Sequence, residues 1–423
     1  MDDTFSFSGY RDQVIVASTA GDTWIVKKRA DVTVANGAAI DASTPALDRT
    51  FIIQGLVNGL NGDGVLIGRS GQEALSEDNV MVVGRTGDIF GSETGAAFYA
   101  NRFTLVNHGK IAGNFGVAGE GDNAFIKNTG VISGAHSGIF LTGESAVVIN
   151  GRHGFIQGEH GLAVELKGDD SGMLNRGEVF QSGDNSAAVF LNSADGDVQW
   201  LTNKGLIQGD IAVHANFGDD VVTNEGDIIG EVHLGDGEDV FVNDGGWVKG
   251  VIYGGLGDDT YIVDRRGLDL HEHVEEGTDY VHSTVSFVLG ENFEQLILDG
   301  GASINGTGNG GDNAIYGNSG RNRLSGLGGN DLLAGLGGND WLTGGAGIDT
   351  FAFTGSGIDR ITDFVNGEDL VRIDVDGLDD FDDLQPLMFE KGGNVIIETG
   401  DGDRLVIMHT SLTDIDATDF RFV

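Results

Sequence analysis

The 423-residue sequence contains no cysteine and only two prolines. Without cysteine it can have neither a disulfide scaffold nor a thiolate metal site. No apolar run approaches the roughly 20 residues of a transmembrane helix. The first residues, 1–5, contain neither the basic nor the apolar region of a Sec signal peptide.

Positive charge is also scarce. The 24 Lys and Arg face 66 Asp and Glu, so the net charge is −42, and we expect no binding to DNA or RNA because phosphates would be repelled. Glycine is abundant, with 72 residues, but it does not follow the strict Gly-X-Y period of collagen. The 39% hydrophobic content argues against disorder. Excess carboxylate in a cysteine-free chain favours a hard cation with oxygen ligands, and we expect several Ca²⁺ ions.

One motif, Asn-x-Gly-x-Ile/Val, recurs through the middle of the chain. Its asparagines are Asn107, Asn128, Asn175, Asn203 and Asn224, with looser copies at Asn150 and Asn243. Short strands joined by tight turns at this spacing predict an all-β, right-handed parallel β-helix with rungs of about 20 residues. We expect the asparagines to form a stacked amide ladder and the glycine two positions later to adopt the positive φ of a corner.

Residues 1–105 are less regular, and we interpret them as degenerate rungs. Phe5, Phe7 and Tyr10 are candidates to cap the open end, because terminal rungs must protect a bare strand edge.

A nine-residue repeat begins at residue 326 and fills residues 326–334, 335–343 and 344–352. The third copy matches the calcium-binding pattern Gly-Gly-x-Gly-x-Asp-x-U-x. We expect its aspartates to stack on one side of a β-roll and to bind calcium with the turn residues. The predicted ligand positions are Gly326, Gly328, Asn330, Asp331, Gly335, Gly337, Asn339, Asp340, Gly344, Ala346 and Asp349.

Three earlier Gly-Asp segments end at Asp220, Asp239 and Asp259, spaced 19 and 20 residues apart. One interpretation is a second calcium ladder, since this spacing places one aspartate on each rung. The alternative is a set of solvated acidic corners.

From residue 250 onward the chain resembles the RTX (repeats-in-toxin) family of secreted calcium-binding proteins. The resemblance rests on the nonapeptides and on spacer-like segments at 259–264, 277–283, 294–298 and 304–309. Segments 357–364 and 367–374 resemble the C-terminal domain of serralysin-type proteases, and we add Asp359 and Asp363 to the predicted metal ligands. The resemblance implies an RTX β-roll, an extracellular location and type I export, because 419–423 is an acid followed by apolar residues.

These patterns predict four segments. Residues 1–105 form an irregular solenoid and cap, 106–253 the Asn-x-Gly-x-Ile rungs, 254–355 the RTX spacer and calcium β-roll, and 356–423 a C-terminal β domain with a secretion signal.

No enzyme motif emerges from the sequence. The His-Glu-x-x-His of zinc proteases, the Gly-x-Ser-x-Gly of lipases and the Tyr-Gly-x-Asp-Pro-His stretch of RTX epimerases are all absent. A polysaccharide lyase is the best enzyme alternative, with Arg152, His153, Glu159 and His160 as candidates to converge. The basic cluster 27–29 could contact an anionic glycan or could be a solvated strand.

The prediction for function is therefore a secreted, calcium-dependent solenoid with a structural or adhesive role at a cell surface or in a matrix. Self-assembly or anionic glycans are its expected contacts. The alternative is a polysaccharide lyase or epimerase-like enzyme.

Overall fold

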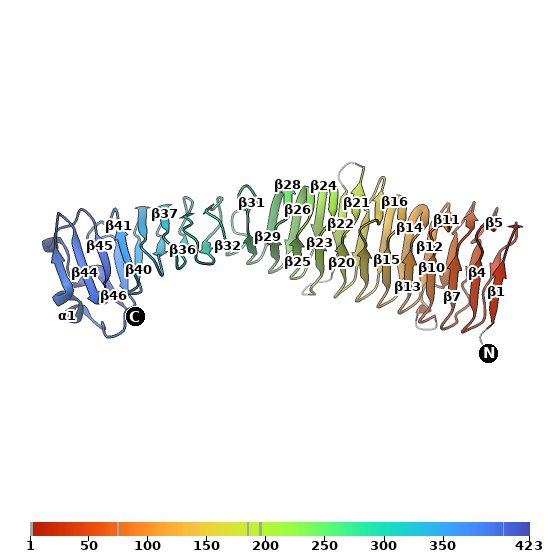
Figure 1. The fold of residues 1–423 in the computed structure, drawn as a ribbon, viewed down its shortest axis with the longest axis horizontal. Helices are drawn as coiled ribbons and strands as arrows, with labels where there is room; N and C mark the ends of the chain where they lie inside the picture. Colours follow the sequence, from red (N-terminus) through yellow and green to blue (C-terminus); the bar gives the residue numbers. More distant parts are fainter. Residues whose placement is uncertain (1–2, 74–75, 184–185, 194–196, 401) are drawn as a thin grey trace. The chain divides into compact units, whose positions relative to one another are not determined.

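The computed structural model describes residues 3–73, 76–183, 186–193, 197–400 and 402–423. The protein is nearly all β, with 51% of residues in strands and 3% in helices. The chain divides into two compact units, Met1–Gly254 (unit 1) and Gly255–Val423 (unit 2). Each is a β-solenoid of stacked, mostly parallel strands (Figure 1), as the sequence predicts. No helix in the described ranges is long and apolar enough to cross a membrane.

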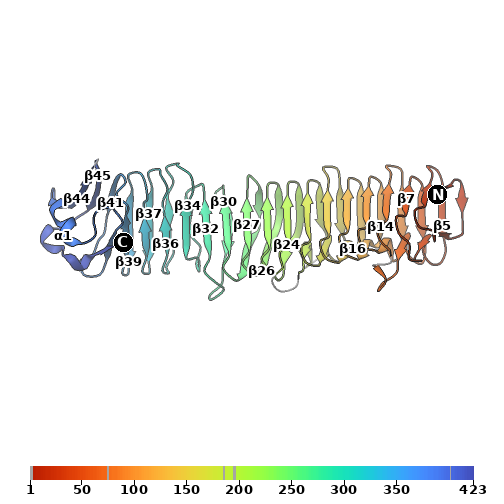
Figure 2. The ribbon, with the colours of Figure 1, turned by 90° about the horizontal axis from the view of Figure 1, so that it is seen from below.

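The first sheet of unit 1 takes one strand from each rung, and every strand pairs in parallel with the next. Its strands are β1 (Thr4–Phe7), β4 (Thr23–Val26), β7 (Thr50–Ile53), β10 (Val80–Val83), β13 (Thr104–Asn107), β15 (Phe125–Asn128), β17 (Val147–Asn150), β20 (Gly172–Asn175), β23 (Trp200–Asn203), β25 (Val221–Asn224) and β27 (Val240–Asn243). Figure 2 shows the parallel stacking from β7 to β27.

The second sheet of unit 1 supplies the other two sides of each rung, and its longest strands bend across both. Its strands are β2 (Tyr10–Arg11), β3 (Ile15–Val16), β5 (Asp31–Val34), β6 (Ile40–Ala42), β8 (Leu56–Gly59), β9 (Val65–Gly68), β11 (Asp88–Gly91), β12 (Thr94–Tyr99), β14 (Lys110–Glu120), β16 (Val131–Thr142), β18 (Phe155–Gly158), β19 (Val164–Lys167), β21 (Glu178–Gln181), β22 (Ala187–Leu191), β24 (Leu206–Ala215), β26 (Asp227–Asp236) and β28 (Trp247–Lys249). The strand β29 (Val251–Leu256) crosses the unit boundary.

The core of unit 1 consists of apolar side chains stacked in rows along the rungs. In the first sheet, Ile126, Val148, Met173 and Leu201 occupy equivalent register positions and are fully buried. Strands such as β15 and β17 show the alternating burial expected of a pleated strand. The handedness of the helix remains a prediction.

The amide ladder at the end of these strands is confirmed. Asn128 Nδ2 donates to Asn150 Oδ1 at 3.0 Å, and Asn150 Nδ2 donates to Asn175 Oδ1 at 2.9 Å. Equivalent bonds run from Asn107 to Asn243, and all seven asparagines are buried. The side-chain oxygens of five ladder asparagines also accept a hydrogen bond from the backbone N–H two residues later, as from Gly130 at 3.1 Å. These asparagines are Asn107, Asn128, Asn175, Asn203 and Asn224.

The expected positive φ of the glycine two residues after the asparagine is found at Gly245, with φ 79°, but is wrong for the regular copies of the motif. Gly109, Gly130 and Gly177 do not have a positive φ. A Cβ at Gly130 would instead overlap the carbonyl oxygen of Gly109 in the preceding rung, and Gly109 and Gly177 meet the same obstacle. Glycine is needed because successive turns pack backbone against backbone.

The first rungs of unit 1 continue the same parallel register, since β1 pairs with β4 and β4 with β7. Phe5 stacks on Trp24 with ring centroids 4.4 Å apart, and Phe7 lies 6.1 Å from the same ring. Tyr10 is exposed.

Unit 2 is built from two parallel sheets. One contains β30 (Thr260–Val263), β32 (Tyr280–Ser283), β34 (Gln295–Leu298), β36 (Ala314–Tyr316), β38 (Leu332–Ala334), β40 (Thr350–Phe353), β42 (Leu370–Ile373) and β46 (Phe420–Phe422). The other contains β33 (Phe287–Val288), β35 (Gly306–Thr307), β37 (Arg323–Gly328), β39 (Trp341–Ala346), β41 (Ile358–Ile361), β45 (Asp403–Ile407), β44 (Val395–Gly400) and β43 (Met388–Glu390). A short strand, β31 (Asp269–His271), lies between β30 and β32 in the sequence and pairs with β29.

The C-terminal part closes the second sheet with antiparallel pairs, β43 with β44 and β44 with β45. Its helical segments are α1 (Phe381–Leu384), η2 (Gln385–Leu387), η3 (Leu412–Asp414) and η4 (Ala417–Asp419). Phe420, in the last strand, is buried and packs near Phe381. The division into four segments remains a prediction.

Candidate metal centre

Each nonapeptide forms one turn and one strand, which is half of a coil. Leu332 pairs with Thr350, and Trp341 pairs with Arg360, so equivalent positions recur after 18 or 19 residues. The expectation that Asp331, Asp340 and Asp349 stack on one side is therefore wrong. Asp331 and Asp349 lie on one edge of the β-roll, and Asp340 lies on the opposite edge.

The first edge carries a ladder of carboxylates just before the strands β38 and β40. Asp331 Oδ1 accepts from the backbone N–H of Asn313 at 2.8 Å, and the N–H of Asp331 donates to Asp349 Oδ1 at 2.9 Å. The N–H of Asp349 donates in turn to Asp369 Oδ1 at 2.9 Å. Asp331 Oδ2 is buried and has no hydrogen-bond partner in the described ranges.

The second edge repeats the arrangement. Asp340 Oδ1 accepts from the N–H of Asn322 at 2.7 Å, and the N–H of Asp340 donates to Asp359 Oδ1 at 3.0 Å. Asp340 Oδ2 is also buried without a hydrogen-bond partner among the described residues. Each carboxylate thus uses one oxygen to hold the neighbouring coil and leaves another for a ligand.

Two glycine positions of the nonapeptide shape this cradle. A Cβ at Gly326, Gly335 or Gly344 would overlap the carboxylate of the aspartate five residues later. The fourth position, as in Gly329 with φ 103°, needs glycine for its left-handed backbone. The third position is different, because a Cβ at Gly328 would lie 3.7 Å from its nearest neighbour. A side chain fits there, which explains Ala346 in the third copy; Gly337 has similar space.

Three further predicted ligands, Asn330, Asn339 and Asp363, accept hydrogen bonds from backbone N–H groups through their side-chain oxygens. Asn330 Oδ1 accepts from the N–H of Ile348 at 2.9 Å, and Asn339 Oδ1 accepts from the N–H of Ile358 at 2.9 Å. Asp363 accepts from the N–H groups of Gly344 at 3.1 Å and Gly345 at 3.0 Å. Their role as calcium ligands remains a prediction.

In the absence of a cation, burial disfavours the ionised form of the ladder carboxylates. Desolvation raises the pKa of Asp331 and of Asp340 to about 6, and that of Asp359 to about 7. The neighbouring carboxylates Asp349 and Asp340 add to the rise for Asp331 and Asp359 respectively. A divalent cation would remove both penalties, because it replaces lost solvation and cancels the repulsion.

The donor set fits calcium. It offers carboxylate and backbone carbonyl oxygens and no sulfur, which are the ligands that Ca²⁺ prefers at 2.3–2.6 Å. This fit is carried by the buried oxygens of Asp331 and Asp340, which have no hydrogen-bond partner within the described part of the chain.

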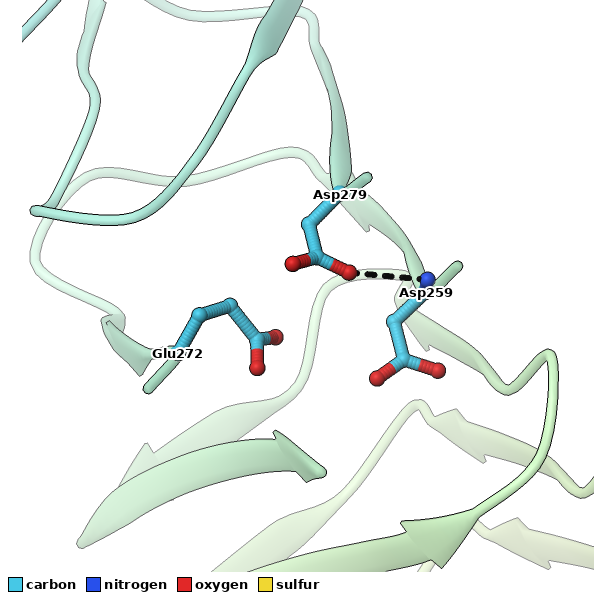
Figure 3. Close-up of side chains that lie close together, drawn as sticks. All are labelled: Asp259, Glu272 and Asp279. Carbon is cyan, nitrogen blue, oxygen red and sulfur yellow. Dashed lines mark hydrogen bonds between the residues drawn. The ribbon is translucent and has the colours of Figure 1, made fainter. Parts of the chain in front are cut away.

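A further carboxylate cluster lies at the start of unit 2 (Figure 3). One oxygen each from Asp259, Glu272 and Asp279 lies within 4.8 Å of the others, and all three residues are buried. The N–H of Asp259 donates to Asp279 Oδ1 at 2.9 Å, and the Tyr261 hydroxyl donates to Glu272. Desolvation raises the pKa of Glu272 to about 8 and that of Asp279 to about 7.

The sequence-based prediction named Asp259 but missed its two partners. Asp279 follows Asp259 by 20 residues and precedes an apolar strand, so the spacing rule could have found it. Glu272 directly follows β31 and has no periodic signal. Only folding brings its side chain toward the two aspartates, as Figure 3 shows.

Asp220 and Asp239 are neighbours in unit 1, one rung apart. The N–H of Gln199 donates to Asp220 Oδ1 at 2.8 Å, and the N–H of Asp220 donates to Asp239 Oδ1 at 2.6 Å. Both side chains are fully buried, so they are not solvated corners. Desolvation raises the pKa of Asp220 to about 8 and that of Asp239 to about 7.

The four candidates for a lyase site do not converge. Arg152 and His153 lie in the turn before β18, whereas Glu159 and His160 follow its other end. A strand of four residues, about 13 Å long, separates the two pairs. His153 instead lines a surface hollow with Arg85, His108 and Thr129.

Comparisons with known proteins agree with the coil geometry of unit 2. The family described as the RTX calcium-binding nonapeptide repeat (4 copies) matches residues 307–342 and again 316–351. The matches include the coils in which Asn313 and Asn322 replace the ladder aspartate.

Two curated proteins of Rhizobium meliloti (strain 1021) are similar to part of the chain. Endo-1,3-1,4-beta-glycanase ExsH is 37% identical over 183 residues, which is 42% of this chain and 37% of the relative. Endo-1,3-1,4-beta-glycanase EglC is 39% identical over 183 residues with the same coverage. The chain thus spans well under half the length of these relatives.

Among solved structures, the extracellular lipase LipA from Serratia marcescens aligns with 59% of this chain and 45% of its own, at 16% identity and a TM-score of 0.21. At that TM-score the likeness carries no argument. The nonapeptide match and the paired coils of unit 2 carry the conclusion that this chain is a β-solenoid that contains RTX calcium-binding nonapeptide repeats.

Proposed function

We propose that this protein is secreted and folds fully only when calcium outside the cell fills its carboxylate ladders. The folded solenoid then serves a structural or adhesive role at a cell surface or in an extracellular matrix. The observation that carries this proposal is the pair of buried ladder carboxylates, Asp331 and Asp340, whose second oxygens have no hydrogen-bond partner among the residues that the structure describes.

The calcium supply decides when the chain folds. In a compartment with little calcium, the carboxylates within a net charge of −42 repel one another and favour an expanded chain suited to export. Extracellular calcium-binding modules have Kd values of about 10⁻⁴–10⁻³ M. Binding free energy then becomes folding free energy. RTX repeat proteins are typically secreted, and the acidic-apolar segment 419–423 supports type I export.

A glycan-directed role is the second candidate. It is favoured by the two relatives, both of which are named endo-1,3-1,4-beta-glycanases. Their similarity spans 183 residues and only 37% of their length, so it supports a shared module more than a shared activity. We place the structural role first, because the lyase candidates lie at opposite ends of β18.

The first experiment is a calcium titration of the purified chain, followed by circular dichroism and light scattering on the same samples. We expect calcium, and not magnesium, to increase β structure and then to produce larger particles. Loss of a polyuronate's viscosity on adding the protein would favour the enzyme instead. Unchanged circular dichroism between calcium-free and calcium-loaded samples would contradict calcium-dependent folding.

Variants locate the effect in the ladders. Asp340→Ala together with Asp349→Ala should raise the calcium midpoint of folding, because one ladder carboxylate is lost on each edge. Asp376→Ala is the matched control, since Asp376 is an exposed acid of the same unit outside the ladders. An unchanged midpoint in the double variant would contradict the ligand assignment.

A further inference from the structure

One corner of unit 1 is basic although the chain as a whole is strongly acidic. This corner is the turn after each strand of the first sheet, directly outside the amide ladder. We call its cationic and histidine side chains the basic corner: Lys27, Lys28, Arg29, Arg85, His108, Arg152, His153, Arg176 and Lys204. About half of the lysines and arginines of unit 1 belong to it.

Backbone hydrogen bonds place these turns in register along the solenoid. The N–H of His108 donates to the carbonyl of Val83 at 2.8 Å, and the N–H of Thr129 donates to that of Asn107 at 2.8 Å. The N–H groups of Arg176 and Lys204 donate to the carbonyls of Asn150 and Asn175 of the preceding rungs, both at 2.7 Å. The turn positions therefore follow one another at the rung spacing of about 4.8 Å, and Gln54 and Thr129 take the place of a basic residue on two of the rungs.

The amide ladder beneath the corner holds these turns in place. Asn107, Asn128, Asn150 and Asn175 are fully buried and bond to one another from rung to rung. The basic side chains above them are exposed. A backbone that is already held in place is suited to bind a polymer through exposed cationic side chains, since little backbone entropy is lost on binding.

The charges of the corner are mostly not neutralised by the protein. No ion pair in the described ranges involves Arg85, Arg152 or Arg176. Lys204 pairs with Glu225, which occupies the same position one rung later. The basic corner thus ends where the turn residues become acidic.

A surface hollow lies at the middle of the basic corner. Arg85, His108, Thr129 and His153 line a surface hollow of about 650 Å³. His108 Nδ1 and Thr129 Oγ1 lie 2.6 Å apart and orient each other. Cationic groups beside a hydroxyl and imidazole nitrogens can bind the carboxylate and hydroxyl groups of an acidic sugar.

We propose that the basic corner binds a linear acidic polysaccharide that runs along the solenoid axis, with about one sugar per rung. The inference rests on the proposed function, because it needs a solenoid exposed to extracellular polymers. A polysaccharide fits better than a nucleic acid for two reasons. Among the described residues, the lining of the hollow includes no Phe, Tyr or Trp on which bases would stack. The cations also form a single narrow row on an otherwise acidic chain, which would repel a wide polyanion.

The test is isothermal titration calorimetry of the calcium-loaded full chain with hexagalacturonate, a uronate oligomer too short to gel with calcium. Cellohexaose serves as the uncharged probe, and a single-stranded DNA oligomer of equal charge serves as the competing polyanion. We expect binding of hexagalacturonate only, weakened by added salt because the contacts are exposed charges.

The triple variant Arg85→Ala, Arg152→Ala and Arg176→Ala should weaken this binding by about tenfold or more. Its matched control replaces three exposed cations of unit 1 outside the corner, as Arg69→Ala, Lys167→Ala and Lys249→Ala. The control should bind within about twofold of the unaltered chain. Circular dichroism in calcium checks that both variants fold.

Three results would overturn the inference: no binding of hexagalacturonate at low salt, an equal loss in both triple variants, or tighter binding of the DNA oligomer. The proposed function fails separately. A chain that binds hexagalacturonate but shows no structural response to calcium would contradict calcium-dependent folding and leave the basic corner supported.

Discussion

The amide ladder of unit 1 and the carboxylate ladders of unit 2 solve the same problem with side chains that differ by one group. Both hold successive coils together through buried side chains. Asn150 donates from Nδ2 to the next asparagine and accepts at Oδ1 from the previous one. Asp331 accepts from one backbone N–H and keeps an oxygen for which the described chain offers no donor.

The difference follows from hydrogen-bonding capacity. An amide is both donor and acceptor, so identical asparagines satisfy one another indefinitely, whereas an ionised carboxylate only accepts. A column of buried carboxylates therefore needs protons or cations from outside the chain. The amide ladder makes rungs that are stable by themselves, and the carboxylate ladder makes coils that depend on calcium.

The largest expected effect is the response to calcium removal. In calcium-free buffer, unit 2 should become sensitive to protease because it carries carboxylate ladders on both edges. The rungs 104–203 should stay resistant, because they are held by the amide ladder and precede the buried Asp220 and Asp239. Limited proteolysis followed by mass spectrometry would locate the cuts. Equal protection of both units without calcium would show that the two ladders do not differ.

Replacement of one ladder carboxylate by an amide should make that coil of unit 2 less dependent on calcium, as the amide-ladder rungs of unit 1 are. Asp331→Asn keeps the acceptor for the N–H of Asn313 and removes the charge. We expect the calcium midpoint of folding to rise by about threefold, because ligand charge tunes affinity, and calcium-free unit 2 to become more stable.

The variant Asp331→Ala separates these effects. It should raise the calcium midpoint similarly but should not stabilise the calcium-free form, because the acceptor is lost. Thermal unfolding followed by circular dichroism, with and without calcium, distinguishes the two variants. Identical behaviour of Asn and Ala would argue against the amide-carboxylate distinction.

Interruption of the amide ladder should destabilise unit 1 alone. Asn150→Ala leaves Asn128 Nδ2 and Asn175 Oδ1 without their ladder partners, at a cost of about 1–3 kcal/mol in unfolding free energy. Urea denaturation in saturating calcium measures it, with the exposed Asn114→Ala as control. A change in the calcium midpoint in Asn150→Ala would mean that the ladders are not independent.

The smallest expected effect is a pH dependence specific to the carboxylate ladders. Burial raises the pKa of Asp331 and Asp340 to about 6 and that of Asp359 to about 7, above the ordinary value near 4. Between pH 4 and 7 the folded, calcium-free chain therefore holds more protons than the unfolded chain. The contribution of these groups to stability is fully present below about pH 4 and is lost as the pH rises through about 6 to 7.

Acid should thus partly replace calcium. Calcium-free unit 2 should regain protease resistance near pH 5 and lose it by pH 8, as measured with an acid-active protease at the lower pH. With calcium present, protons compete with the metal, so the calcium midpoint should rise as the pH falls. A calcium-free unit 2 that grows more stable with rising pH would contradict the buried-carboxylate account.

The sequence was sufficient to predict the repeat units and much of their chemistry. The recurring asparagines predict the amide ladder because one residue type at one rung position must stack on itself. The nonapeptides predict calcium turns because glycines and an aspartate recur in fixed order. Asp220 and Asp239 were found by the same spacing argument.

Other features depend on how many repeats complete one coil, and the repeat length alone does not determine that number. A nine-residue period does not tell whether one repeat or two complete a coil, so the placement of Asp340 beside Asp331 and Asp349 was wrong. In the regular copies of the motif, the glycine two residues after the asparagine is required by a neighbouring rung's carbonyl, as at Gly130, and not by its own φ. Glu272 lacks any repeat and enters its cluster only through the fold.

The sequence alone therefore determines whether a ladder consists of amides or of carboxylates, because hydrogen-bonding capacity is a property of the side chain. Which carboxylates share an edge, which glycines have no room for a Cβ and which cations line up at one corner were decided by tertiary structure. These relations depend on the register between coils, and that register is set by contacts between residues about 18 to 30 positions apart.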